Sequence, residues 1–220
     1  SHHAYLLIGS ASTRTDLISI LEETHKISAK ANPDFFDRQY DNFTIDDARE
    51  LKLFHETRPI GESGKKIFIL MMSGITSEAQ NALLKLLEEP ADYAHFFLIV
   101  PSAHLLLPTV KSRLSLVDDS RFTIHDSDNV EVIDDAKKFL KMNVPKRLEY
   151  IKGLMDEISK EKKKKYDAIE FLNALEKLVH DEKGSKEGKE MLEAIGTAQK
   201  YAGDRAPSLK MLLEYVALNI

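Results

Sequence analysis

Apolar residues follow two arrangements along this chain, continuous runs in its first half and helical stripes throughout. Residues 66–72 and 94–100 are almost wholly apolar over strand length, which is typical of strands buried on both faces of a parallel sheet. Three other runs are shorter and weaker. We expect strands at residues 4–8, 35–40, 66–72, 94–100 and 114–117, and residues 122–124 could add a short edge strand.

Residues 77–90 carry a strong amphipathic stripe and read SEAQNALLKLLEEP. The spacing i, i+3, i+4, i+7, i+8 places the apolar residues on one face of an α-helix, which must be buried. These residues are Ala79, Ala82, Leu83, Leu86 and Leu87. Ser77 and Gln80 have the spacing of a capping box and predict the helix start, and Pro90 prevents its continuation.

Helical patterns also lie between the other predicted strands. We expect residues 9–14 to form a polar turn and residues 16–24 a helix, with Thr15 or Asp16 as its N-cap. Thr44 predicts the start of the next helix in the same way. Strands that alternate with helices predict an α/β fold of the P-loop type, with a parallel five-stranded sheet covered on both faces.

From Val130 onward the chain has helical patterns only. We expect five helices, at residues 131–142, 145–160, 166–180, 185–201 and 207–219, whose apolar stripes build a bundle core. The acidic, polar link at residues 118–129 predicts a boundary between a sheet domain, residues 1–125, and an all-α domain, residues 126–220. The run KEKKKK at residues 160–165 lacks interleaved aromatics, so it fits a solvated helix junction better than a nucleic-acid patch.

Composition excludes several classes of site. The 220 residues include no cysteine, so disulfides and thiolate metal sites are absent, and the eight histidines lack the spacing of metal ligands. We therefore expect no metal. No apolar run is long enough to span a bilayer and no signal-peptide core begins the chain, so we expect a cytoplasmic protein without membrane contact. A net charge of −5 gives no overall attraction to nucleic acid.

Residues 78–90 closely resemble a signature of the clamp-loader branch of AAA+ ATPases, and the bacterial delta-prime and gamma/tau subunits of DNA polymerase III are the nearest comparison. In that family the signature helix follows the Walker B strand, which corresponds here to residues 66–72. The resemblance implies an AAA+ sheet domain and, more loosely through residues 207–215, a collar-like helical domain. No motif of the family's three-helix lid is present, so we expect the lid to be reduced or absent.

The family's first strand runs into a phosphate-binding loop of the form G-x-x-x-x-G-K-S/T, which is degenerate here. Counted from Gly9, the second glycine is replaced by Arg14, the lysine by Thr15 and the hydroxyl residue by Asp16. The lysine neutralises phosphates and the hydroxyl holds magnesium, so the substitutions remove this chemistry.

The Walker B strand normally ends in two acids that orient magnesium and the attacking water. Their positions hold Leu70 and Met71, and neither side chain can bind a cation. The resemblance therefore implies a subunit with no ATPase activity and no cofactor of its own. A degenerate but active ATPase is the least favoured alternative.

Residues 106–113, LLPTVKSR, resemble the family element that carries an arginine finger for ATP bound by a neighbouring subunit. By this resemblance Ser112 and Arg113 would be the trans-acting pair, since a fixed cation stabilises charge on a transferring phosphoryl group. A surface arginine in a local salt bridge is the alternative. Lys111 is more simply a solvated lysine.

The function implied by the resemblance is that of a delta-prime-like, non-catalytic clamp-loader subunit. Its partners would be the gamma/tau and delta subunits, with the sliding clamp contacted indirectly and primed DNA through the complex. The alternative is a stand-alone scaffold or adaptor built on a degenerate AAA+ fold.

Overall fold

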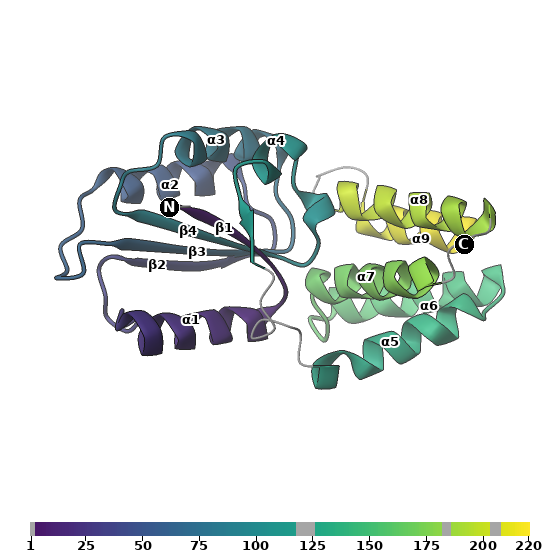
Figure 1. The fold of residues 1–220 in the computed structure, drawn as a ribbon. Helices are drawn as coiled ribbons and strands as arrows, with labels where there is room; N and C mark the ends of the chain where they lie inside the picture. Colours follow the sequence, from purple (N-terminus) through teal and green to yellow (C-terminus); the bar gives the residue numbers. More distant parts are fainter. Residues whose placement is uncertain (1–2, 118–125, 182–185, 203–207) are drawn as a thin grey trace. The chain divides into compact units, whose positions relative to one another are not determined.

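The computed structural model describes residues 3–117, 126–181, 186–202 and 208–220 (Figure 1). The chain divides into two compact units, Ser1–Ile124 and His125–Ile220. The first unit contains the sheet, and in the described residues of the second unit every regular element is a helix.

Within the described residues, five parallel strands form one sheet in the order β2-β3-β4-β1-β5. Their bounds are β1 (Ala4–Ile8), β2 (Phe35–Tyr40), β3 (Lys66–Met72), β4 (Ala94–Val100) and β5 (Ser115–Leu116). Every residue of β3 is buried, as its continuous apolar sequence predicts for an inner strand covered on both faces. The predicted five-stranded parallel fold is confirmed. The proposed edge strand at residues 122–124 lies outside the described residues.

Helices cover both faces of this sheet (Figure 1). Helix α1 (Ala11–His25) lies on one face, and α2 (Ile45–Glu56), α3 (Ser77–Glu88) and α4 (Pro108–Lys111) lie on the other. A short 3₁₀ turn, Ala103–Leu105, precedes α4. This distribution follows from the right-handed crossovers that join parallel strands, and it explains why the stripe of α3 is buried.

Helix α1 begins earlier than the sequence pattern predicts. Its N-cap is Ser10, whose backbone N–H donates to Thr13 Oγ1 over 3.0 Å in a capping box. The prediction of a turn over residues 9–14, with Thr15 or Asp16 as the cap, was therefore wrong. Thr13 reaches this position because Gly9 has no side chain: a Cβ there would lie 1.9 Å from Thr13 Oγ1.

The start of α3 also differs from the prediction. Thr76 is the N-cap, and the Ala79 backbone N–H donates to its hydroxyl over 3.3 Å. The predicted Ser77–Gln80 capping box was wrong, because Gln80 is buried and turns its amide toward another segment. The cap predicted for α2 is confirmed, since the Thr44 backbone N–H donates to Asp47 Oδ2 over 2.7 Å.

The second unit is a bundle of helices, close to the predicted set. They are α5 (Asp126–Leu140), α6 (Val144–Ser159), α7 (Lys165–Asp181), α8 (Lys186–Tyr201) and α9 (Leu209–Asn219). Helix α7 packs against α5 and α8, and α9 packs against α6 and α8, so all of them share one core. The lysine-rich run joins α6 to α7, where Lys163 pairs with Glu157 at 3.2 Å. Pro207 lies outside the described residues.

One buried cation in this bundle was not predicted. Arg147 is 9% exposed and donates to the backbone oxygens of Phe139 and Leu140 over 3.3 and 3.0 Å. These carbonyls lie at the C-terminal end of α5, where cations and donors satisfy the free carbonyl groups. A periodic sequence pattern contains no signal for this contact between two helices.

His55 makes the stability of the first unit dependent on pH. Its ring accepts a hydrogen bond at Nε2 from the Ala91 backbone N–H over 3.2 Å and lies against Phe68 and Phe96. Burial, assisted by Lys66 and opposed by Glu56, lowers the pKa of His55 below 6.5. The unfolded chain therefore binds a proton before the folded chain does, and unfolding free energy should fall as pH drops below 6.5.

We expect His55→Gln, which keeps a side-chain acceptor, to reduce this acid-side loss. Urea unfolding at several pH values between 5 and 7 measures the slope. The exposed His180→Gln is the matched control and should keep the parent slope. Equal slopes for all three proteins would contradict the assignment to His55.

Candidate functional site

The corner between β1 and α1 is short. Only Gly9 and Ser10 connect the two elements, and the Gly9 backbone N–H donates to the Val100 oxygen over 3.0 Å. The next N–H, of Ser10, is taken by Thr13. A phosphate-binding loop needs several free backbone N–H groups around the anion, and these two are already bonded within the fold.

Arg14, Thr15 and Asp16 lie in the first turns of α1 and not in a loop. The Arg14 guanidinium reaches β2, where its Nε donates to Asp37 Oδ1 over 2.8 Å and its Nη2 to Asp37 Oδ2. This hydrogen bond raises the pKa of Arg14 further. The Thr15 hydroxyl donates back to the Ala11 oxygen over 3.0 Å. The residue at the second-glycine position is therefore a link between α1 and the sheet.

Leu70 and Met71 belong to the hydrophobic core. They are 0% and 3% exposed, and they lie in β3 between β2 and β4. Their alkyl and thioether groups provide no hard oxygen ligand for magnesium and no base for water. Within the described ranges, no group of three or more His, Cys, Asp or Glu side chains is placed to hold a metal ion.

Arg113 follows α4 and is held by an acid of α3. Its Nη2 donates to Glu88 Oε1, and its Nη1 donates to the Thr109 oxygen over 2.8 Å and contacts Ser112 Oγ at 3.3 Å. Ser112 is the C-cap of α4, and its hydroxyl donates to the same Thr109 oxygen over 2.9 Å. The Arg113 and Glu88 side chains are 34% and 47% exposed, so the ion pair is open to solvent.

Near the start of α3, the Gln80 side chain holds residues that precede Arg113 in the chain. Its amide donates to the Leu105 oxygen over 3.2 Å and accepts from the Leu107 backbone N–H over 2.6 Å. Helix α3 thus holds residues 105–113 at both ends, through Gln80 near its start and Glu88 at its last residue. The signal that could have revealed Gln80 is a polar residue beside the apolar stripe, on the buried side of the helix.

Gln80→Leu should destabilise this segment. The substitution keeps the side-chain volume and leaves a partly buried N–H and carbonyl of residues 105–107 without partners, which costs about 1–3 kcal/mol. Urea unfolding measures the loss. Asn81→Leu, at the exposed neighbouring position, is the matched control and should change stability by less than about 0.5 kcal/mol. A Gln80→Leu protein as stable as the control would contradict this contact.

Arg113 and the β1–α1 corner lie at opposite ends of the parallel strands. Ser115, two residues after Arg113, pairs with Tyr5 near the start of β1, whereas Gly9 follows the end of β1. A strand rises about 3.3 Å per residue, so the residues beside Tyr5 and the β1–α1 corner lie roughly 15 Å apart along β1. The structure therefore keeps Arg113 apart from Gly9, Arg14 and Met71. An anion that Arg113 contacts lies outside this chain's own β1–α1 corner.

The family model described as "DNA polymerase III, delta subunit" matches residues 15–123. Among curated proteins, the chain is similar to a replication factor C small subunit from Methanococcus maripaludis, with 31% identity over 99 residues. That match covers 44% of this chain and 30% of the relative, so the chain corresponds to less than a third of that protein's length.

Among solved structures, the chain is similar to a DNA polymerase III gamma subunit-related protein from Thermotoga maritima. The alignment covers 99% of this chain and 94% of that one, at 19% identity and a TM-score of 0.45. In the part of the chain that the structure describes, no helix is long and apolar enough to cross a membrane.

Proposed function

Because this chain belongs to the AAA+ clamp-loader family, we propose that it is a delta-prime-like subunit that has no ATPase site of its own and supplies an arginine in trans. The observation that carries the proposal is the position of Arg113. It is solvent-accessible, and it lies at the opposite end of the strands from the β1–α1 corner. An arginine at this place can contact the phosphates of a nucleotide bound by a neighbouring subunit. It cannot contact those of a nucleotide bound at the β1–α1 corner of its own chain.

The proposed absence of catalysis by this chain rests on five side chains. Arg14 is engaged with Asp37, Thr15 and Asp16 lie within α1, and Leu70 and Met71 are buried apolar residues. Phosphoryl transfer depends on positioned cations and a metal ion to neutralise phosphate charge. None of these residues supplies the lysine or the acids on which this chemistry depends.

Isothermal titration calorimetry with MgATP tests this part directly. We expect no binding heat at protein concentrations of tens of micromolar, and no phosphate release above a blank. A gamma-type motor subunit, titrated under the same conditions, is the positive control. A micromolar dissociation constant for this chain alone would contradict the proposal.

Transfer of Arg113 to a neighbour's phosphate requires that it leave Glu88. Exposed ion pairs are worth only about 0–1 kcal/mol, so this exchange has a small cost compared with a charge-assisted, two-donor contact to phosphate. Glu88 would hold the guanidinium in place in the free subunit. Ser112 would position the residue through its bond to the Thr109 oxygen.

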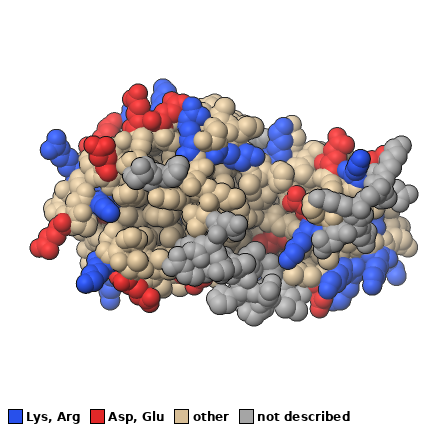
Figure 2. Space-filling view, viewed as in Figure 1, with Lys and Arg blue, Asp and Glu red and all other residues tan. Residues whose placement is uncertain are grey.

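The proposed partners are the gamma/tau and delta subunits, with the sliding clamp contacted indirectly and primed DNA reached through the complex. Helix α9 supports a subunit contact, because Met211, Tyr215 and Leu218 are 60%, 41% and 57% exposed at a spacing that places them on one face. In the view of Figure 2, acidic and basic side chains are interspersed over α2, α3 and α4. This face therefore has no continuous basic patch that would attract DNA.

We also propose that residues 126–220 act as the collar-like domain, with the lid reduced or absent. The packing of α5 and α6 into the same bundle as α7, α8 and α9 supports this assignment. A cytoplasmic location is part of the same proposal.

A stand-alone scaffold is the second candidate, and the Glu88–Arg113 pair is the observation that favours it. In the structure the guanidinium already has partners within its own chain. Affinity purification of the tagged protein from its native cells separates the two candidates. Recovery of gamma/tau or of the sliding clamp supports the clamp-loader subunit, whereas recovery of neither supports the scaffold.

A further inference from the structure

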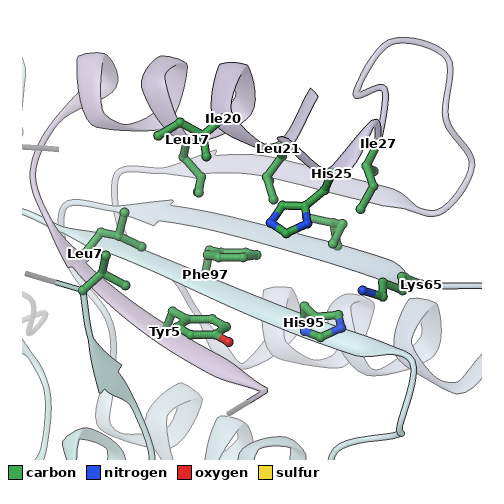
Figure 3. Close-up of a pocket in the computed structure, with 12 residues that line it drawn as sticks. Tyr5, Leu7, Leu17, Ile20, Leu21, His25, Ile27, Lys65, His95 and Phe97 are labelled. Carbon is green, nitrogen blue, oxygen red and sulfur yellow. The ribbon is translucent and has the colours of Figure 1, made fainter. Parts of the chain in front are cut away.

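An open cavity of about 360 Å³ lies between α1 and the sheet, on the face opposite α4, the helix that precedes Arg113 (Figures 1 and 3). Twelve residues line it, all from the first unit. Its deep end is closed by Leu7 and Leu17, which are 1% and 3% exposed. The volume is within the range of small-molecule sites, about 300–1,000 Å³.

The two walls of the cavity differ in shape. The floor is aromatic, because Tyr5 of β1 and Phe97 of β4 are cross-strand partners whose rings stack on each other, with centroids 5.1 Å apart and planes inclined by 15°. The opposite wall is aliphatic and is formed by Leu17, Ile20 and Leu21 of α1 (Figure 3). Aromatic rings pair by offset stacking or by edge-to-face contact, so a slot between an aromatic floor and an aliphatic wall fits a planar ring.

The open end of the cavity carries basic groups. Lys65, His25 and His95 gather there (Figure 3), and His95 stacks on His3 with centroids 5.7 Å apart. No Asp or Glu is among the lining residues. Burial and the nearby Lys65, His3 and His25 together lower the pKa of His95, as expected where positive groups meet without an acid between them.

We propose that this cavity binds a planar aromatic anion, with its ring against the Tyr5–Phe97 floor and its anionic group beside Lys65 and His95. The apolar end of the cavity favours binding of the aromatic ring. The basic groups at its open end favour binding of the negative charge. The site lies on the α1 face of the sheet. None of its lining residues belongs to the degenerate nucleotide site or to residues 105–113. It therefore stands independently of the clamp-loader proposal.

The probe for this site is 8-anilinonaphthalene-1-sulfonate, an aromatic anion with a planar naphthalene ring system, whose fluorescence rises in an apolar environment. Titration into the folded protein should give saturable binding of one molecule per chain. Lys65→Glu, at an exposed position, should weaken binding at least tenfold because it reverses the charge at the open end. Ile20→Glu, on the aliphatic wall, should abolish binding. Far-UV circular dichroism confirms that each variant is folded.

Two controls make the result decisive. Lys85→Glu changes an exposed lysine of the groove between α2 and α3 and should leave the affinity within twofold. The uncharged N-phenyl-1-naphthylamine should bind wild type and Lys65→Glu equally. The proposal is overturned by non-saturable fluorescence, by equal probe affinity for wild type and Lys65→Glu, or by a dimer in light scattering whose formation displaces the probe and so assigns this face to a second copy.

Discussion

Arg113→Ala is expected to lower ATP hydrolysis at the neighbouring subunit's site about a hundredfold or more in an assembled clamp loader. Arginine fingers contribute roughly 10³–10⁵ in rate where they contact the transferring phosphoryl group. Because one chain can serve one site, the steady-state ATPase of a complex with several sites falls less than single-turnover hydrolysis at that site. Rapid-quench measurement of phosphate release reads the affected site, and fluorescence of labelled clamp reads loading onto primed DNA.

Arg49→Ala is the matched control for this experiment. Arg49 is also a surface arginine paired with an acid, since its Nη1 lies 2.7 Å from Asp46 Oδ1, but it belongs to α2. Its loss should leave both rates unchanged. Arg113→Lys should retain little of the activity, because an ammonium group lacks the planar, two-donor geometry of guanidinium. Complex assembly, followed by native mass spectrometry, should be intact in all three variants. Unchanged hydrolysis with Arg113→Ala in an intact complex would reject the finger.

Leu83→Ala is expected to destabilise the first unit by about 2–5 kcal/mol, a large part of the roughly 5–15 kcal/mol that stabilises a typical domain. Leu83 lies on α3 and is fully buried against the sheet. Removing its side-chain methyl groups costs both the transfer free energy and the cavity left behind. Urea unfolding followed by circular dichroism measures the shift in midpoint.

Leu53→Ala is the matched control, because it exchanges the same two residue types. Leu53 is on the neighbouring α2 but is 68% exposed, so its truncation should change the unfolding free energy by less than about 0.5 kcal/mol. Similar losses for the two variants would mean that the stripe of α3 is not the buried face that holds this helix on the sheet.

The strands and helices were predictable because burial leaves a periodic trace in the sequence. The continuous apolar run of β3 and the stripe of α3 each specify an element and its buried side. Helix starts were less predictable where several hydroxyl residues compete. Ser10, Ser12, Thr13 and Thr15 all lie near the start of α1, and the close approach of Thr13 to Gly9 decides among them.

The side-chain contacts of the candidate site could not be read from the sequence in the same way. Arg113 and Glu88 are 25 positions apart, and Gln80 contacts Leu105 across a similar interval. Such pairs depend on how β4 places the residues after it beside α3, which no local pattern encodes. Arg14 of α1 illustrates the same point, because its partner Asp37 lies 23 positions away in β2.

That this chain is a clamp-loader subunit is tested most directly by mixing it with a gamma-type motor subunit and measuring the mass of the product by native mass spectrometry. We predict a heteromeric complex that contains both chains and persists on dilution into the sub-micromolar range. Two separate species at the masses of the free proteins, under conditions in which the motor subunit assembles with its other partners, would contradict it.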